Sequence, residues 1–495
     1  MATPIPDNQC KFSVAEIVEA ASAIFHGDPS LRIDGVSVDS RKIRPHQLFV
    51  ALRGVHDGHD FIDEAARLEA SAAIVERGRS SPKLPCFEVD DTLIALGQLA
   101  AYHLERTRKH HQLPVIAIGG AAGKTTTKEL TAAIARALFG EVLATTGNLN
   151  NLIGVPMTLL TLTDADRAAV IECGTNRPGE IARLARIVRP DVSLVLNVDI
   201  EHTEGLGSLE GVADEEAALF TTAKIAVTGA GEAMLRERIP AGLPTVTFGD
   251  SPLAAVRLLN RKLIAPGRQR ISIGLPPTMI EPDLRLDTAV SGPCDDPEPL
   301  FEFPLNLIGN ASALNAAAAI AAVVAAAERP LSHAQLIVID AALETVKPVP
   351  GRLATRELHD LVVIDDTYNA NPRSVRAALD AARETADALS ARLLIVLGDM
   401  LELGELSAAM HIGVLRGLLH NIHPDLSVLV GSEFAAAAKT VASIPDSGYD
   451  PNRVAFAADS ATAARAVRSL VKPGDVLLVK GSRGIAMEKV IDALE

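Results

Sequence analysis

The sequence predicts an α/β protein of three domains, because strand-like and helix-like segments alternate along its 495 residues. A chain of this length exceeds one ordinary hydrophobic core and is expected to divide. Apolar strands that alternate with helices are typical of parallel sheets covered by helices. We expect a small N-terminal α/β domain over 1–108, a central parallel-sheet domain over 109–345 and a C-terminal Rossmann-like α/β domain over 346–495.

The N-terminal domain is predicted from a helical pattern at its start and from β-prone segments at 36–52 and 72–78, with an alanine-rich helix between them. A charged helix at 96–111 then leads into an apolar strand at 113–120. Further apolar strands follow, each separated from the next by a helix, at 140–145, 168–174, 192–198 and 224–229. This alternation predicts the parallel sheet of the central domain.

Breaks in these patterns mark the start of the last domain. Residues 250–305 are richer in proline and charge and contain only short strand-like pieces. The sequence PVPGR at 348–352 interrupts both helix and strand patterns and indicates a domain edge. Strands between helices resume beyond it, at 360–370, 391–400, 426–431 and 475–482.

The uncharged stretch from Phe303 to Ala327 is long enough to cross a membrane, since about 18 apolar residues suffice. Its first half, however, contains a proline, a glycine, a serine and three asparagines, and its second half is mostly alanine. We therefore predict a strand, a loop and a buried helix here, and no membrane partner.

The composition limits the class of protein further. The net charge of −15, without a basic stripe, argues against nucleic acid as the main partner. Four cysteines lie far apart without metal-site spacing, and the N-terminus lacks the pattern of a signal peptide. We expect a cytoplasmic protein, and a monomer.

The sequence GAAGKT at 120–125 follows a predicted strand and precedes a polar helix start, which is the context of a phosphate-binding loop. Gly120 and Gly123 let backbone amides approach phosphate oxygens, and the helix N-terminus favours an anion. Lys124 is expected to neutralise phosphate charge and the Thr125 hydroxyl to bind Mg²⁺. A chance match to the motif is the alternative.

Three neighbours of these residues belong to the same prediction. Thr126 is expected to contact the nucleotide from the first helical turn. Ala121 and Ala122 have no polar side chain, so we expect their backbone amides to contact the phosphates.

Two further side chains follow predicted strands. Glu172 ends the strand at 168–174 and is placed to bind Mg²⁺, directly or through water, although a surface carboxylate that caps a loop fits the pattern equally well. His202 lies in the loop after the strand at 192–198. A lone loop histidine is usually solvated, so only the surrounding motifs support a function for it.

Near the C-terminus, two loops contain polar side chains directly after strands. Asp366 can bond ribose hydroxyls and Tyr368 can stack on a base, whereas an asparagine-rich turn is the plainer interpretation. Lys480 and Arg483 follow another strand in a loop suited to a carboxylate or a phosphate. A solvated basic loop is the alternative there.

These motifs occur together and in order, and with them nearly the full chain resembles the Mur ligase family. The stretch VDSRKIRPHQLFVALRGVHDGHDF at 38–61 is similar to the family's UDP-binding domain, with Ser40 and Arg41 at its uracil-side motif. The stretch GNLNNLIGVPMTLL at 147–160 is similar to the segment that faces the substrate. Its asparagines are Asn148, Asn150 and Asn151. The C-terminal motifs are PGR, DDTYNANPRSVRAAL, GDMLELGELSAAMH and VKGSRGIAME.

The resemblance is strongest to the branch that joins D-Ala-D-Ala to UDP-N-acetylmuramoyl-tripeptide in peptidoglycan precursor synthesis. It implies that ATP, with Mg²⁺, phosphorylates the terminal carboxylate of the peptide to an acyl phosphate. The amine of D-Ala-D-Ala then displaces phosphate through a tetrahedral intermediate. Closure of the C-terminal domain would exclude water.

The resemblance also implies roles for single residues. Catalytic roles fall to Lys124, His202 and Arg352, of which Arg352 would reach the γ-phosphate from the C-terminal domain. Lys480 and Arg483 would lie on the amine side. The implied metal ligands are Thr125, Glu172 and His202. The implied ATP contacts are Gly120, Gly123, Lys124, Thr125, Thr126, Asn315, Arg352, Asp366, Tyr368 and Asn369.

Two positions depart from the family pattern. A carbamylated lysine that holds the second Mg²⁺ in the family is replaced by Glu216, in the sequence DEEAALF. Glu216 keeps the charge and oxygens on a shorter stem and is therefore a candidate metal ligand, with Asp214 and Glu215 nearby. A solvated acidic helix start is the alternative. Ala311 stands where the family has a histidine, which puts one nucleotide contact in doubt.

These departures leave two other functions open. One is a related ligase that takes another acyl or amine substrate. The other is a nucleotide-binding pseudo-ligase with a regulatory role, against which the retention of the other motif residues argues. The sequence does not reveal the third residue of the peptide.

Overall fold

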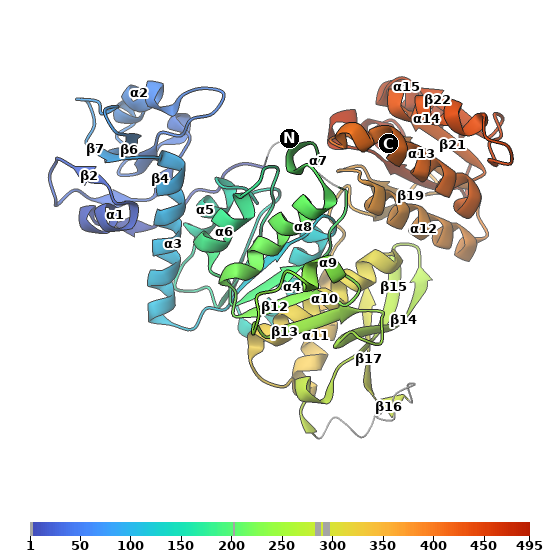
Figure 1. Cartoon of the computed structure of the whole chain (residues 1–495), viewed down its shortest axis with the longest axis horizontal. Coiled ribbons are helices and arrows are strands. Elements are labelled where there is room, and N and C mark those ends of the chain that lie inside the picture. The colour runs from blue at the N-terminus through green and yellow to red at the C-terminus, as the bar shows by residue number, and fades with distance from the viewer. Residues whose placement is uncertain (1–2, 201–202, 283–288, 291–297) are drawn as a thin grey trace.

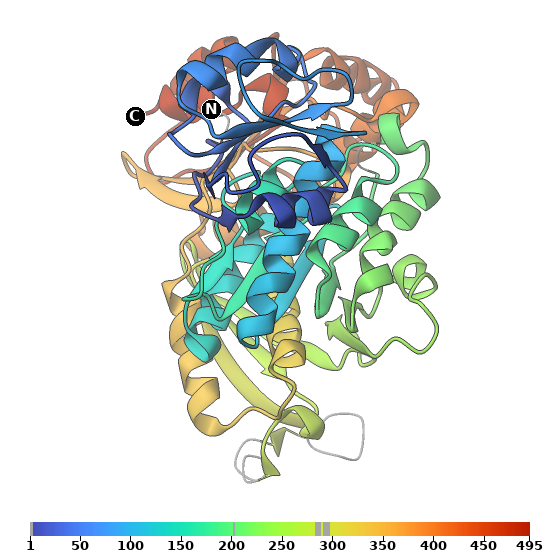
Figure 2. The ribbon, with the colours of Figure 1, turned by 90° about the vertical axis from the view of Figure 1, so that its left-hand side faces the viewer.

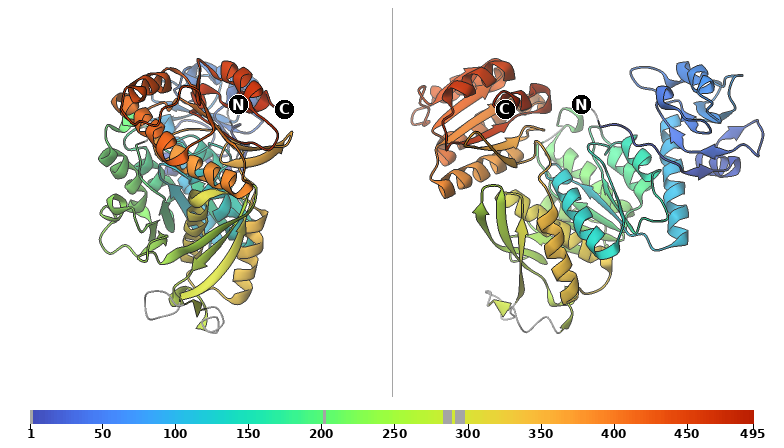
Figure 3. Two further views of the ribbon diagram at one scale, coloured as in Figure 1. Left: turned by 90° about the vertical axis from the view of Figure 1, so that its right-hand side faces the viewer. Right: turned by 180° about the vertical axis from the view of Figure 1, so that it is seen from behind.

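The computed structural model describes residues 3–200, 203–282, 289–290 and 298–495 and places three larger sheets one after another along the chain (Figure 1). The N-terminal and C-terminal sheets lie on opposite sides of the central one, as the view from behind also shows (Figure 3). The predicted α/β class is confirmed. The domain limits at 108 and 345 stay predictions. The first falls in the last turn of helix α3 (Thr92–His110), and the second falls at the end of helix α11 (His333–Thr345).

The N-terminal part has a five-stranded sheet in the order β2-β7-β6-β5-β4, parallel except at β2, and a small antiparallel pair β1-β3. Its strands are β1 (Lys11–Phe12), β2 (Ile24–Phe25), β3 (Ile33–Asp34), β4 (Val36–Ser37), β5 (Leu48–Val50), β6 (Ala72–Glu76) and β7 (Cys86–Val89). Its helices are α1 (Val14–Ala21), α2 (Ile62–Arg67) and α3 (Thr92–His110). Figure 2 shows α3 extending from this sheet along the central part.

The central sheet has the order β16-β17-β15-β14-β13-β12-β11-β8-β10-β9, parallel from β9 to β14 and antiparallel beyond. Its strands are β8 (Val115–Gly119), β9 (Val142–Ala144), β10 (Ala168–Glu172), β11 (Val192–Val195), β12 (Ile225–Gly229), β13 (Thr245–Gly249), β14 (Val256–Ala265), β15 (Arg268–Gly274), β16 (Ala289–Val290) and β17 (Glu298–Leu305). Its helices are α4 (Lys124–Phe139), α5 (Gly154–Leu159), α6 (Glu180–Val188), α7 (Thr203–Leu206), α8 (Leu209–Ala217), α9 (Ala233–Arg236), α10 (Gly309–Ala327) and α11 (His333–Thr345).

Strand β8 shows why this sheet is buried on both faces. Val115 and Ala117 join a core shared with α3 and α6, whereas Ile116 and Ile118 join the core under α4 and α10. Successive strand side chains point to opposite faces, so an uninterrupted apolar run requires cover on both. Strand β8 also lies between β10 and β11, and the order of the strands along the chain reverses there. In open α/β sheets, ligands bind at such a reversal, outside the carboxyl ends of the strands.

Helix α10 confirms the predicted strand, loop and buried helix, because it follows β17 and a short loop. It is the one helix among the described residues that is long and apolar enough to cross a membrane, and 67% of its most apolar window is buried. Most of its alanines and both its valines belong to the core beneath the central sheet.

The C-terminal part has a six-stranded sheet in the order β18-β19-β23-β20-β21-β22, parallel except at β18. Its strands are β18 (Ala354–Leu358), β19 (Leu361–Asp366), β20 (Leu393–Gly398), β21 (Leu426–Val430), β22 (Val454–Ala457) and β23 (Val476–Lys480). Its helices are α12 (Pro372–Leu389), α13 (Ser407–Gly417), α14 (Ser432–Ala442), α15 (Ser460–Leu470) and α16 (Glu488–Asp492).

Helix α12 holds the C-terminal part against the central one. Arg373 at its start donates to Glu232 over 2.8 Å, and Glu384 accepts from Arg261 of β14 over 2.6 Å. Between these ion pairs, Gly309 of α10 approaches Ala381 so closely that a Cβ on Gly309 would lie 2.8 Å from the Ala381 Cβ.

We expect Gly309→Ala to lower the thermal unfolding midpoint, because Gly309 has φ +81° and lacks room for a Cβ. The strain and the contact together should cost about 1–3 kcal/mol. Gly413→Ala is the matched control, since Gly413 lies in α13 with no atom within 4 Å of an added Cβ. An unchanged midpoint for Gly309→Ala would show that α10 and α12 do not approach this closely.

Candidate active site

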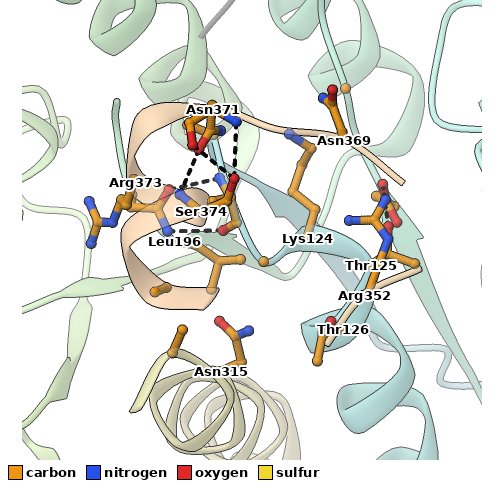
Figure 4. Close-up of a pocket in the computed structure, with 18 of the residues that line it drawn as sticks. Lys124, Thr125, Thr126, Leu196, Asn315, Arg352, Asn369, Asn371, Arg373 and Ser374 are labelled. Atoms are coloured by element: carbon orange, nitrogen blue, oxygen red, sulfur yellow. Dashed lines mark hydrogen bonds between the residues drawn. The ribbon is translucent and has the colours of Figure 1, made fainter. Parts of the chain in front are cut away.

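A cavity of about 820 Å³ lies where the carboxyl ends of the central strands face the C-terminal part. Its walls include the loop after β8, the ends of β10 and β11, and the start of α10. Residues after β19 and the start of α12 complete it from the other side. Figure 4 shows Lys124, Asn315, Arg352 and Asn371 around this space, from four separate segments of the chain.

The predicted phosphate loop is formed between β8 and α4. Gly120 and Gly123 have φ values of +117° and +91°, which glycine adopts most readily. A Cβ on Gly120 would lie 2.9 Å from the Leu196 backbone nitrogen, and one on Gly123 would lie 2.6 Å from the Asn315 side-chain oxygen. Both glycines are therefore required by close contacts within the protein itself.

The expectation for Ala121 and Ala122 is wrong. Their backbone N–H groups donate to Asn197, to its carbonyl oxygen over 3.0 Å and to its side-chain oxygen over 2.8 Å. The Asn197 amide also donates to the Ala122 carbonyl. Asn197 thus holds the loop, and the amides that remain for an anion lie further along, at the N-terminus of α4.

Lys124, Thr125 and Thr126 form the first turn of α4, and all three line the cavity. The Lys124 ammonium donates to the Gly120 carbonyl. The Thr125 hydroxyl donates to Glu172 Oε1 over 3.2 Å. The two residues expected to serve a metal, Thr125 and Glu172, are therefore in contact.

Glu172 is buried at the end of β10, and its Oε1 also accepts from the Asn150 amide. Its Oε2 is buried with no hydrogen-bond partner among the described residues. A buried carboxylate oxygen calls for a cation or a donor, so this oxygen fits a magnesium ion. No cluster of three His, Cys, Asp or Glu side chains occurs in the described part of the chain.

Cys173 lies next to this carboxylate. Burial, together with the charges of Glu216 and Glu172, raises the pKa of the Cys173 thiol. The thiol therefore stays protonated at neutral pH in the ligand-free protein.

Arg352 and Tyr368 contact one another in the structure. The Arg352 guanidinium lies 4.2 Å from the centre of the Tyr368 ring, and the Arg483 guanidinium lies 5.7 Å from it. Arginine thus lies against the ring of Tyr368, and the expected stacking of this ring on a base stays a prediction. Tyr368 and Arg352 both line the cavity.

Asp366 and Lys480 form a buried ion pair. Lys480 Nζ donates to Asp366 Oδ2 over 2.6 Å and to the Asn369 carbonyl over 2.9 Å. The other Asp366 oxygen accepts from the Leu353 amide. The structure pairs the two across the neighbouring strands β19 and β23. Both also line the main cavity, so their expected ligand contacts stay predictions. Asn369 remains exposed and lines the cavity.

A second, small cavity of about 50 Å³ adjoins this region. It is lined by residues 369–371, 401–403 and 482–484. Arg483 contributes to it with a side chain that is 52% exposed.

The three predicted asparagines after β9 all line the main cavity. Asn150 donates to Glu172 over 2.9 Å, and Asn151 accepts from the amides of Ile153 and Gly154 at the start of α5. The Asn148 backbone N–H donates to the Thr3 hydroxyl, which leaves the Asn148 side chain out of this bond. Only part of this set is thus available to a ligand through its side chains.

Ser40 and Arg41 lie in the N-terminal part and do not line the main cavity. Ser40 is buried, and the exposed Arg41 forms a two-point ion pair with Asp39 over 2.8 and 2.9 Å. His202 lies outside the described residues. Its predicted role therefore stays a prediction.

Glu216 is neither solvated nor in the cavity wall, so the alternative of a solvated acidic helix start is wrong. It is 3% exposed, and its Oε2 accepts from the Gly120 amide over 2.6 Å. The structure places this carboxylate beneath the phosphate loop, not among the residues that line the cavity.

Asn197 and Glu232 line the cavity but carry no sequence signal comparable to a motif. Arg373 also lines it and lies within the motif DDTYNANPRSVRAAL, although no role was predicted for it. Asn197 ends an apolar strand run, and a lone polar residue there is the only available hint. The partnership of Glu232 with Arg373 joins residues 141 apart in the chain.

Three family models match the chain. They are described as the Mur ligase family catalytic domain at 32–103, the Mur ligase middle domain at 118–323 and the Mur ligase glutamate ligase domain at 351–483. A UDP-N-acetylmuramoyl-tripeptide–D-alanyl-D-alanine ligase of Escherichia coli is 36% identical, over 94% of each chain. The chain belongs to the Mur ligase family.

Other Mur ligases agree with this over the full length. The enzyme of the same name from Bacillus subtilis is 30% identical over 97% of each chain. A crystal structure of MurF from Acinetobacter baumannii has a TM-score of 0.83 at 28% identity, over 99% of each chain. MurF ligase from Thermotoga maritima in complex with ADP has a TM-score of 0.75 at 27% identity, over 93% of this chain and 96% of that one.

We expect Lys480→Met to destabilise this Mur ligase, because it leaves the Asp366 carboxylate buried without its cation. Removing one partner of such a pair costs about 3–5 kcal/mol, which should appear as a lower thermal unfolding midpoint. The double variant with Asp366→Asn should recover part of the loss. Lys489→Met, on the exposed side of α16, is the control. A midpoint unchanged by Lys480→Met would argue against the ion pair.

Proposed function

We propose that this Mur ligase joins D-Ala-D-Ala to UDP-N-acetylmuramoyl-tripeptide with hydrolysis of ATP to ADP and phosphate. The observation that carries the proposal is the single cavity in which Lys124 and Thr125 of the central part meet Arg352 of the C-terminal part. The names of the full-length relatives support the two substrates.

In the first step, a carboxylate oxygen of the tripeptide forms a bond to the γ-phosphorus, and the bond from that phosphorus to the bridging oxygen of ADP breaks. Catalysis of such a transfer depends on positioning and on charge. Lys124 and the N-terminus of α4 supply positive charge from one side, and Arg352 supplies it from the other. Asn315, against Gly123, would contact the nucleotide.

In the second step, the free amine of D-Ala-D-Ala attacks the acyl carbon, the carbon–oxygen bond to phosphate breaks, and the amine loses a proton. The small cavity at residues 369–371, 401–403 and 482–484 supports an amine site on this side. Arg483, at its edge, is suited to the dipeptide carboxylate because a guanidinium binds carboxylates through two hydrogen bonds.

Thr125 and Glu172 are the residues that would hold Mg²⁺, which when bound neutralises charge on the nucleotide phosphates. The partnerless buried oxygen of Glu172 supports this assignment. Ser40 and Arg41 would bind the UDP end of the substrate. A cytoplasmic location agrees with the need for ATP and with the free Cys10, Cys86 and Cys173.

We expect phosphate to be released from ATP only when both UDP-tripeptide and D-Ala-D-Ala are present. The UDP-tripeptide is needed to form the acyl phosphate, and D-Ala-D-Ala is needed to displace phosphate from it. A coupled phosphate assay with each substrate omitted in turn measures this. Absence of release with both present would rule out the proposed ligase.

Lys124→Ala should lower the rate by at least about a hundredfold, since it removes a preorganised charge at the transferred phosphoryl group. The unfolding midpoint should stay near that of the parent, because Lys124 is only half-buried. Lys109→Ala, at the exposed end of α3, serves as control. An unaffected rate would remove the phosphate loop from the mechanism.

Added bicarbonate should leave the rate of the wild-type enzyme unchanged. No lysine occurs between Val212 and Thr222, so the segment that carries the carbamylated lysine in relatives has nothing to carbamylate. Assays in degassed buffer with and without bicarbonate test this. A rate that rises with bicarbonate would mean that another lysine takes that role.

A further inference from the structure

Helix α8 carries three successive carboxylates, and two of them are buried. Asp214 is exposed and pairs with Arg238 over 2.6 Å. Glu215 and Glu216 are only 7% and 3% exposed. Buried carboxylates require hydrogen-bond donors, so their partners indicate what the helix does.

Glu216 accepts a hydrogen bond from the phosphate loop. Its Oε2 accepts from the Gly120 N–H over 2.6 Å, a short hydrogen bond of the kind that a charged acceptor makes. A Cβ on Gly119 would lie 2.8 Å from the same oxygen. The carboxylate thus occupies the space that a side chain at Gly119 would need.

The partners of Glu215 belong to the loop that follows β10 and to the first turn of α6. Its Oε2 accepts from the Gly179 amide over 2.6 Å, and its Oε1 accepts from the Ile181 amide over 2.8 Å and the Thr175 hydroxyl over 3.1 Å. This loop starts directly after Glu172 and lines the cavity through Thr175 and Asn176.

We infer that α8 fixes the positions of two loops at the cavity, the phosphate loop after β8 and the loop after β10 that follows Glu172. In this arrangement Glu216 is a positioning residue of the phosphate loop and not a ligand of Mg²⁺. Glu216 fixes the first amide of the loop, and Glu215 fixes the loop after Glu172. The inference rests on the proposed function in one respect, since it assigns the nucleotide phosphates to the loop that Glu216 holds.

The placement of Glu216 separates the two roles. Thr125 and Glu172 line the cavity, whereas Glu216 does not, and one of its oxygens is engaged by a backbone amide. A magnesium ligand loses affinity when its carboxylate becomes an amide. An acceptor for a backbone N–H keeps its function in that change, because the glutamine side-chain oxygen accepts as well.

The test compares Glu216→Gln, Glu216→Ala and the control Glu210→Gln, which makes the same change on the exposed side of α8. The readouts are the Kd of a fluorescent ADP, titrated without muramoyl or dipeptide substrates, and the Mg²⁺ concentration for half-maximal binding. Unfolding midpoints are recorded for all three.

We expect Glu216→Gln to keep both values within about threefold of the parent, as Glu210→Gln does. Glu216→Ala should raise the Kd of ADP by about tenfold or more at saturating Mg²⁺, because the hydrogen bond to Gly120 is lost. A tenfold higher Mg²⁺ requirement for Glu216→Gln, or an unchanged Kd for Glu216→Ala, would overturn the inference. If Glu216→Ala does not fold, the Mg²⁺ requirement of Glu216→Gln decides the inference alone. A value within about threefold of the parent supports it, and a tenfold higher value overturns it.

These measurements need no ligation. If the substrate assignment is wrong, ADP still binds and its Kd still responds to the Glu216 substitutions. If the positioning role of Glu216 is wrong, the ADP-binding measurements contradict it while the wild-type enzyme still forms product.

Discussion

The backbone amides of the phosphate loop are the constraint on which the site depends. A buried N–H without a partner is costly, and this loop turns three of its amides inward. Asn197 and Glu216 accept from them, and that satisfies the loop before any nucleotide is present. The same contacts explain the lack of side chains at Gly119 and Gly120 and the burial of a carboxylate in α8.

Much of the fold could be predicted from the sequence because its signals are local. The apolar run of β8, the glycines after it and the following helix lie within 30 residues, and each has a direct physical meaning. The buried helix α10 was predictable for the same reason, since a proline and an asparagine before it and two asparagines in its first turns argue against an uninterrupted membrane span.

The partners within the site were harder to predict, because they depend on contacts between distant segments. Asp366 and Lys480 each resemble a ligand-binding residue in sequence, yet they are 114 positions apart and satisfy each other. Tyr368 looked free to stack on a base until Arg352 was found on its ring. Glu216 had the charge of a metal ligand in sequence. Its burial and its hydrogen bond from the Gly120 N–H depend on how α8 packs against the end of β8, which the sequence does not show.

The helix starts around the cavity have a consequence for how an anionic substrate approaches. Helices α4, α10 and α12 all begin at this cavity, so three positive dipole ends and Lys124 attract phosphate there. The chain as a whole carries a net charge of −15 and repels the same substrate from afar. At physiological ionic strength, screening over about 8 Å suppresses that distant repulsion and leaves the contact attraction nearly intact. Capture therefore begins at the mouth of the cavity, and diffusion rather than long-range steering brings the substrate to it.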